Sequence, residues 1–311
     1  MNLEGFESVK RWITKLGKKS DSPNTRRLYF YALERFCEYV GMNPDELVAE
    51  RRRNLESRDE FTRRHAEDKI DEWFLRLTKT VSPKTGKELS RNTCVSCYQA
   101  VRSFYKANRS KLEPEDPPAS WVTKAKPGLT REELKDMLDH TDNLMHRAYV
   151  LCQVQSGLSV SDLLRLTVND INETEPGYIH LYLTRGKEKH LGFFDTFFGK
   201  TATATLKEYL KTRKLNPTSK LIPCTPQNVR HFLAKLSDKA GLDWKVGTHT
   251  LRKYFYTNLS LARVNSPAFN DTLIEFWMGH SLGKVKGAYF IPPVEEQLRL
   301  YKLAETRLEP D

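Results

Sequence analysis

The sequence lacks the features that mark several common protein classes. No apolar run approaches the ~20 residues that a helix needs to cross a bilayer, and charges interrupt residues 1–20 throughout, so no signal-peptide core is evident there. We therefore expect a cytoplasmic protein. Carboxylates do not cluster in the pattern that holds catalytic metal ions, and we expect no metal and no cofactor.

Cysteine is scarce and scattered. The five cysteines are an odd number spread along the chain, which argues against a disulfide framework. Cys94 and Cys97 have the spacing of a zinc-binding pair, but the sequence offers no second pair to complete a four-ligand site. On a helix this spacing places both thiols on one face, which we expect to be buried in the core.

The chain does contain an excess of positive charge, with 51 lysines and arginines against 40 acidic residues. Pro127 separates 26 basic and 19 acidic residues, a net +7, from 25 and 21, a net +4. Both parts are basic, as expected of a protein that contacts a polyanion with each. Its 311 residues are sufficient for two domains with separate cores.

Residues 1–111 show helical periodicity without strand alternation, and they predict a small helical bundle. Helices are expected at 22–41, 59–78 and 90–108. Residues 112–128 contain four prolines and little periodicity, and they predict an extended linker. The bundle carries basic residues that fit either a DNA-binding face or an ordinary solvated face: Arg26, Arg27, Arg63, Arg64, Arg91, Arg102 and Lys106.

Residues 129–311 predict a second domain, mainly helical, with one small β-hairpin. Residues 178–183 show the alternating pattern of a strand. A turn is expected at 184–187, and residues 190–194 are expected to form the second strand of the hairpin. Helices are expected around this hairpin at 130–140, 144–155, from Ser159 onward, 225–240, 248–262 and 294–303. The fold class is therefore mainly α with a small β-hairpin or sheet.

The most informative residues lie between His249 and Tyr289, in the segments HTLRKYF, MGHS and LGKVKGAYF. Arg252 can hold two phosphate oxygens with its planar fork. His249 and His280 can donate hydrogen bonds or transfer protons near neutral pH. Tyr289 supplies an oxygen nucleophile. In a basic chain, this set indicates metal-free phosphoryl transfer on nucleic acid.

Together these segments resemble the catalytic half of the tyrosine recombinases, the integrase family. The resemblance covers about Thr130 to Tyr301, and it extends in architecture to the N-terminal bundle, which is similar to a core-binding, SAM-like domain. It implies a clamp on DNA, strand cleavage through a 3′-phosphotyrosine intermediate, release of a 5′-hydroxyl and rejoining. It further implies Tyr289 as nucleophile, with His249, Arg252 and His280 around the scissile phosphate.

The resemblance also implies a lysine on the hairpin that protonates the leaving oxygen. Lys187 is the candidate, with Lys189 and Arg185 as rivals, although a solvated turn would carry such charges too. Lys284 and Lys286, close to the nucleophile, are expected to bind DNA. The resemblance suggests a phage- or archaeal-type integrase of prokaryotic or viral origin, acting on a mobile element.

One position departs from the family pattern. The first family arginine aligns with Ser159, while Asp162 fits the acidic position that follows it. Serine is a good helix N-cap but cannot replace a guanidinium. Three interpretations follow: Arg165 or Arg185 substitutes, the enzyme is slow, or the chain is a DNA-binding relative. By helical geometry Arg165 should point to a different side of its helix, which favours Arg185.

Other activities fit less well. A type IB-like topoisomerase or a hairpin telomere resolvase would share the chemistry, but the short N-terminal domain favours an integrase. A recombinase of this kind is expected to act as a homo-tetramer on double-stranded DNA with inverted-repeat-like sites. The segment after Tyr289 carries apolar residues on a short helix that could pack in its own subunit or in a neighbour, and we expect exchange between subunits.

Overall fold

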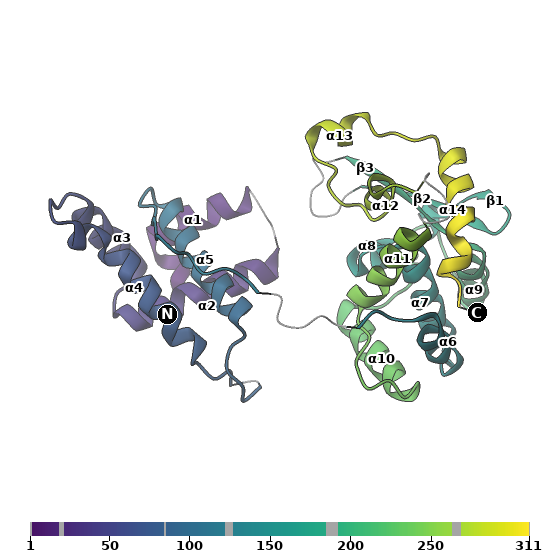
Figure 1. Ribbon diagram of the computed structural model, residues 1–311, viewed down its shortest axis with the longest axis horizontal. Coiled ribbons are helices and arrows are strands. Elements are labelled where there is room, and N and C mark those ends of the chain that lie inside the picture. Colours follow the sequence, from purple (N-terminus) through teal and green to yellow (C-terminus); the bar gives the residue numbers. More distant parts are fainter. Residues whose placement is uncertain are drawn as a thin grey trace. The chain divides into compact units, whose positions relative to one another are not determined.

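The computed structural model describes residues 2–18, 22–83, 85–121, 127–184, 192–262 and 269–310. The chain forms two compact units, Met1–Ala125 and Lys126–Asp311, and each has its own hydrophobic core (Figure 1). The division falls inside the proline-rich segment 112–128. Of the helices that the structure describes, none is both long and apolar enough to cross a membrane.

The first unit is a helical bundle built around α5. Trp12 lies fully buried at its centre, where its ring stacks on Tyr29 at 5.8 Å and meets the edge of Phe104 at 5.5 Å. Cys94 and Cys97 are both buried on α5, which confirms their expected place in the core. The elements of this unit are η1 Leu3–Gly5, α1 Glu7–Gly17, α2 Pro23–Val40, α3 Pro44–Leu55, α4 Glu60–Thr78 and α5 Arg91–Ala107.

The second unit is organised around α7, whose residues from Ala148 to Ser156 are all buried. Helices α9, α11 and α14 and strand β3 pack against it. The helices of this unit are α6 Arg131–Asp139, α7 Leu144–Ser156, α8 Val160–Arg165, η2 Val168–Asp170, α9 Lys200–Lys211, α10 Pro226–Lys239, α11 Thr248–Ala262, α12 Asp271–Trp277, α13 Lys284–Tyr289 and α14 Val294–Leu308. The mainly helical fold expected from the sequence is confirmed.

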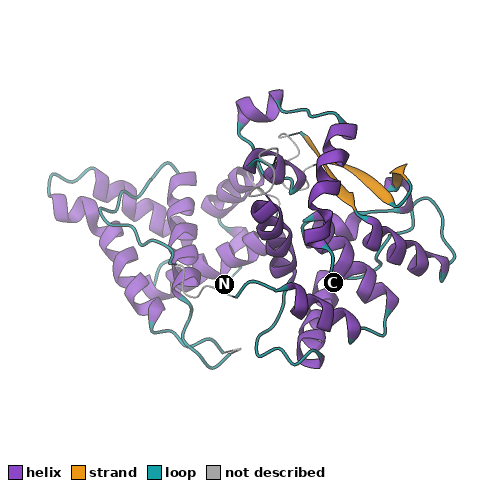
Figure 2. Ribbon diagram, turned by 45° about the vertical axis from the view of Figure 1, so that its right-hand side comes forward, coloured by secondary structure: helices purple, strands orange, loops and turns teal. Residues whose placement is uncertain are grey.

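A small antiparallel sheet covers one part of this unit (Figure 2). Its strands are β1 Asn172–Glu175, β2 Tyr178–Thr184 and β3 Phe193–Phe198, in the order β1-β2-β3. The predicted hairpin is present, since Leu183 pairs with Phe194 and Thr184 with Phe193. Strand β1 was not expected, because its four residues are all exposed and carry no alternation.

Helix α14 packs on its own unit. Gln297 is fully buried: its amide nitrogen donates to Asp195 at 3.1 Å, and its amide oxygen accepts from Trp277 at 2.8 Å. The buried Tyr301 hydroxyl donates to the Gln155 carbonyl at 2.8 Å. From the sequence we expect this segment to be exchanged between subunits; in this single chain it packs in its own.

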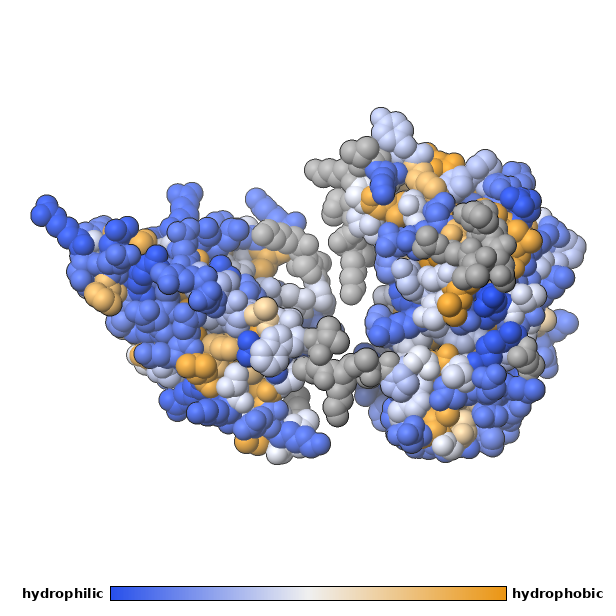
Figure 3. All heavy atoms as spheres, viewed as in Figure 1, coloured by the Kyte–Doolittle hydropathy of each residue, from blue (hydrophilic) through white to orange (hydrophobic). Residues whose placement is uncertain are grey.

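The surface matches the charged composition. Most of the visible face of both units is hydrophilic, with small apolar areas between the charged side chains (Figure 3). Among the described residues, no group of three or more His, Cys, Asp and Glu side chains is arranged to hold a metal ion.

Candidate active site and nucleic-acid interface

Arg252 joins three segments that are distant in sequence. It lies on the first turns of α11, and its guanidinium donates to the backbone carbonyl of Gly157 and, at 2.7 Å, to that of Met278. Gly157 ends α7 two residues before Ser159, and Met278 ends α12 two residues before His280. These contacts, which we call the Arg252 junction, bring three of the motif segments together.

Two glycines allow this close approach. Gly157 has φ +64°, and a Cβ atom there would lie 2.3 Å from Cδ1 of Phe255 on α11. Gly279 has φ +67°, and a Cβ atom would lie 2.9 Å from Cζ of Phe194 on β3. Left-handed backbone and missing side chains are both needed at these points. The glycine before His280 therefore has a packing reason as well as a conformational one.

The environment of Arg252 affects its ionisation. Burial lowers the pKa of the guanidinium, and the nearby Asp162 carboxylate raises it in opposition. Arginine nevertheless stays protonated near neutral pH. Its two carbonyl partners occupy only part of a fork with five N–H donors, so further donors remain for a phosphate.

Ser159 is the N-cap of α8, as the sequence predicts. Its Oγ accepts from the Asp162 backbone N–H at 3.2 Å and donates to Asp162 Oδ2 at 2.7 Å. Arg165 lies 3.5 Å from the other carboxylate oxygen and also donates to the Thr184 carbonyl. Helical spacing suggests that Arg165 lies on a different side of α8 from Ser159, but its long side chain reaches the same Asp162 carboxylate.

Both histidines lie next to the Arg252 junction and are exposed. His249 is the second residue of α11, three positions before Arg252. The backbone N–H of His280 donates to the Glu275 carbonyl at 2.9 Å, which fixes the chain just after Gly279. The structure thus gathers the segments of Ser159, His249, Arg252 and His280 in one region of the second unit.

Tyr289 is placed differently. It is the last residue of α13, and its side chain is 85% exposed. In Figure 1 α13 stands at the edge of its unit, apart from α11. Lys286 on the same helix is exposed, and the side chain of Lys284 lies outside the described part of the chain. The nucleophile candidate is therefore not packed against the Arg252 junction.

The hairpin turn that should carry the general acid falls outside the described residues, and so do Arg185, Lys187 and Lys189. The strands on either side of it are described up to Thr184 and from Phe193. The choice among the three side chains remains a prediction.

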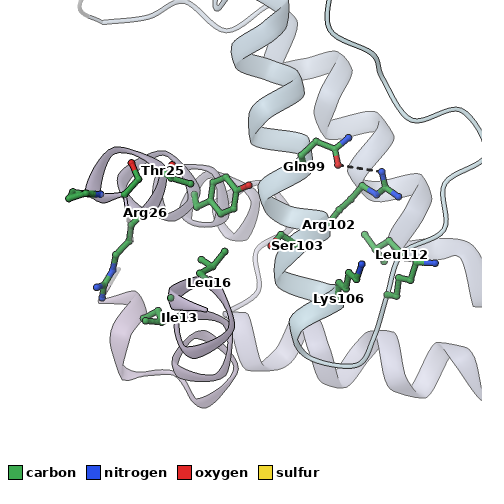
Figure 4. Close-up of a pocket in the computed structure, with 14 residues that line it drawn as sticks. Ile13, Leu16, Thr25, Arg26, Gln99, Arg102, Ser103, Lys106 and Leu112 are labelled. Atoms are coloured by element: carbon green, nitrogen blue, oxygen red, sulfur yellow. Dashed lines mark hydrogen bonds between the residues drawn. The ribbon is translucent and has the colours of Figure 1, made fainter. Parts of the chain in front are cut away.

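In the first unit, three of the predicted basic residues line one cavity. Arg26 from α2 and Arg102 and Lys106 from α5 line a cavity of about 560 Å³, with Ile13 and Leu16 of α1 on its apolar side (Figure 4). The sequence did not single out Lys111, which also lines this cavity. A polyanion could meet positive charge and apolar surface together here.

The other predicted basic residues of the first unit differ in their contacts. Arg27 and Arg63 are exposed. Arg64 is engaged by two carboxylates, Glu115 at 2.7 Å and Glu60 at 3.5 Å. The Arg91 guanidinium lies 3.8 Å over the Trp121 ring and holds the middle of the linker against α5.

Comparisons with known proteins identify the family of this chain. Residues 128–286, just over half of the chain, match the phage integrase family. The tyrosine recombinase XerA of Pyrococcus horikoshii is 26% identical over 260 residues, which cover 81% of this chain and 79% of that protein. The tyrosine recombinase XerC of Bacillus subtilis is 27% identical over 197 residues, or 56% of this chain and 63% of that protein.

A solved structure supports the fold. The integrase of the Tn1549 transposon, in complex with transposon right end DNA, superposes with a TM-score of 0.52 and 17% identity, over 75% of this chain and 82% of that chain. The resemblance inferred from the motifs is thereby confirmed, and the chain belongs to the phage integrase family of tyrosine recombinases, the enzymes of site-specific DNA recombination.

Proposed function

We propose that this recombinase cuts one DNA strand with Tyr289. The tyrosine oxygen attacks the scissile phosphorus, the bond to the 5′ oxygen breaks, and a 3′-phosphotyrosine link forms. The tyrosine loses its proton to a neighbouring base and the leaving 5′ oxygen gains one. Attack by the 5′-hydroxyl of a second strand reverses these steps and joins the new partners.

The observation that carries this proposal is the Arg252 junction. A pre-placed guanidinium with unused donors can stabilise the charge that develops on the non-bridging oxygens. His249 and His280 are exposed beside it, where they can donate hydrogen bonds or accept the tyrosine proton. These groups need no reorganisation, because backbone bonds already fix their segments.

We assign protonation of the leaving oxygen to the hairpin, with Lys187 first and Lys189 or Arg185 as rivals. A substrate with sulfur in place of the 5′ oxygen has a leaving group that departs without a proton. If alanine at one of these three positions slows cleavage of the normal substrate but not of the sulfur substrate, that residue is the general acid. Alanine substitution of the other two positions should reduce cleavage of both substrates equally or not at all.

The exposed Tyr289 requires a movement before cleavage. Helix α13 must dock so that the tyrosine oxygen reaches the phosphate at the Arg252 junction. Binding of the DNA backbone by the exposed Lys286 on this helix, and by Lys284, would hold α13 in the docked position. Docking on DNA would also prevent reaction with free phosphates.

We further propose that the active assembly is a homo-tetramer on two duplexes with inverted-repeat-like sites, in which C-terminal segments are exchanged between subunits. Exchange of α14 would require it to leave the buried contacts of Gln297 and Tyr301 and to remake them in a neighbour. Integration or excision of a mobile element is the biological setting that such a reaction fits.

The test uses a duplex that carries the site selected by the Tyr289→Phe protein from a pool of random inverted repeats. A nick close to the cleavage position lets a short fragment diffuse away and traps the covalent intermediate; we call this duplex the nicked substrate. Wild-type protein should form an adduct that survives denaturation, and Tyr289→Phe should form none. Clean DNA binding without an adduct from wild type would instead support a DNA-binding relative.

A further inference from the structure

The Asp162 carboxylate binds a neutral and a charged group on its two oxygens, Ser159 Oγ on one and the Arg165 guanidinium on the other. We propose that Arg165 is a catalytic residue. It supplies a second phosphate-binding guanidinium, in place of the arginine that the family pattern has at the position of Ser159. The inference rests on the proposed cleavage by Tyr289.

The position of Arg165 supports this role. The residue ends α8, and its side chain remains 32% exposed although it contacts Asp162 at 3.5 Å. Its Nη2 atom also donates to the Thr184 carbonyl at the end of β2. Two contacts through one nitrogen hold the guanidinium in place and leave its remaining N–H donors for an anion.

The electrostatics of the site also favour a cation beside Asp162. Asp162 is only 17% exposed, so water screens its charge poorly, and a carboxylate near the scissile phosphate would repel it. Ser159 hydrogen-bonds this carboxylate but cannot neutralise it. Arg252 is close enough for this carboxylate to oppose the lowering of its pKa by burial, but its hydrogen bonds go to the carbonyls of Gly157 and Met278. Arg165 is the guanidinium within 4 Å of Asp162 among the described residues.

A different role for Arg165 must be separated from this one. Its contact with Thr184 ties α8 to the base of the hairpin, so the residue could act only by positioning the hairpin turn. A positioning residue would matter equally for any substrate. A residue that neutralises phosphate charge matters less when the phosphate itself carries no charge.

The experiment therefore uses the full chain and two forms of the nicked substrate, one with a normal scissile phosphate and one with a neutral methylphosphonate at that position. Arg165→Ala is compared with Arg230→Ala, an exposed arginine of the same unit whose guanidinium donates to Gln227 at 3.1 Å. Adduct formation is followed in time, and thermal unfolding of each variant checks the fold.

We expect Arg165→Ala to slow cleavage of the phosphate by about 100- to 1000-fold, the effect of removing one charge-stabilising donor. On the methylphosphonate the loss should be less than about 10-fold, while Arg230→Ala matches wild type on both. Adding Ser159→Arg to Arg165→Ala should restore cleavage of the phosphate.

Three results would overturn the inference. Normal phosphate cleavage by Arg165→Ala removes the role altogether. Equal losses on both substrates show a positioning residue. Absence of any adduct from wild type refutes the proposed cleavage itself, and the inference with it, which distinguishes that failure from the first two.

Discussion

Gly157 shows how a single residue can determine the geometry of the site. Its carbonyl accepts from Arg252, its left-handed φ of +64° ends α7, and the missing side chain leaves room for the Phe255 ring. A β-carbon would disturb all three at once. The Arg252 junction therefore depends on a residue that has no functional group of its own.

Gly157→Ala should lower the free energy of unfolding of the second unit by about 2–4 kcal/mol, because left-handed strain adds to overlap with Phe255. Gly241→Ala is the matched control, since Gly241 has φ +69° but nothing within 4 Å of an added Cβ. It should cost about 1–2 kcal/mol from strain alone. Hydrogen exchange of the α7 amides measures both values, and equal losses would contradict the role of Phe255.

For single residues, the sequence predicted helix caps well but did not predict the contacts of long side chains. Ser159 was expected as an N-cap and is one, because capping depends on neighbours within one turn. Arg165 was expected to face away, because helical spacing describes Cβ directions and not the reach of a guanidinium. The exposure of Tyr289 could not be predicted, since its neighbours along the chain do not determine where α13 lies.

Helix α14 is held to the second unit by buried polar contacts that the sequence did not predict. The sequence suggests a short apolar helix that is free to pack elsewhere, but the observed helix carries buried polar anchors as well. Glu305 is 6% exposed, accepts from the Lys200 backbone N–H at 2.6 Å and binds the Tyr178 hydroxyl. Burial, together with Glu305, raises the pKa of that hydroxyl. Any exchange between subunits must remake these bonds.

Glu305→Ala should destabilise the second unit by about 2–4 kcal/mol, because it leaves the Tyr178 hydroxyl buried without its partner and also removes the acceptor of the Lys200 N–H. Glu296→Ala removes a carboxylate from the same helix, where it pairs with Arg299 on the surface at 2.6 Å, and should have no measurable effect. Urea denaturation compares the two variants. Similar midpoints would show that α14 is not anchored by Glu305.

Local signals predicted several elements, but not every element that has such a signal. Helix α11 matches its expected bounds, 248–262, and Thr130 forms the expected capping box of α6. Helices α1, α3, α9, α12 and α13 were not singled out, although Asn43 and Glu46 form a capping box at the start of α3. Strand β1 is defined by its pairing with β2. Its own four exposed residues carry no sequence pattern that predicts this tertiary contact.

At the scale of the whole molecule, the chain has two units with separate cores, and charge supports a DNA partner for both. The family match lies in the second unit together with the motifs. The role of the first unit rests on its basic cavity, lined by Arg26, Arg102 and Lys106. Sequence reasoning found these three residues, but it could not show that they share one cavity.

If Arg102 and Lys106 each contact a phosphate, their double alanine variant should reduce the slope of log affinity against log salt concentration by about 2, since each contact contributes about 0.9. The matched control replaces Lys10 and Arg35 by alanine, which removes the same amount of charge. These two side chains already pair with Glu7 and Glu38 on the surface. Its slope should equal that of wild type. Titrations on the selected duplex at several salt concentrations give both slopes, and identical slopes for the two double variants would exclude the cavity from the interface.

The central claim is that Tyr289 becomes covalently joined to DNA. The most direct measurement is peptide mapping of the adduct that wild type forms with the nicked substrate. Trypsin should release residues 287–299 linked to the 3′ phosphate of the cleaved strand, with fragmentation placing the nucleotide on Tyr289. A nucleotide on any other residue, or a 5′ linkage, would contradict the account.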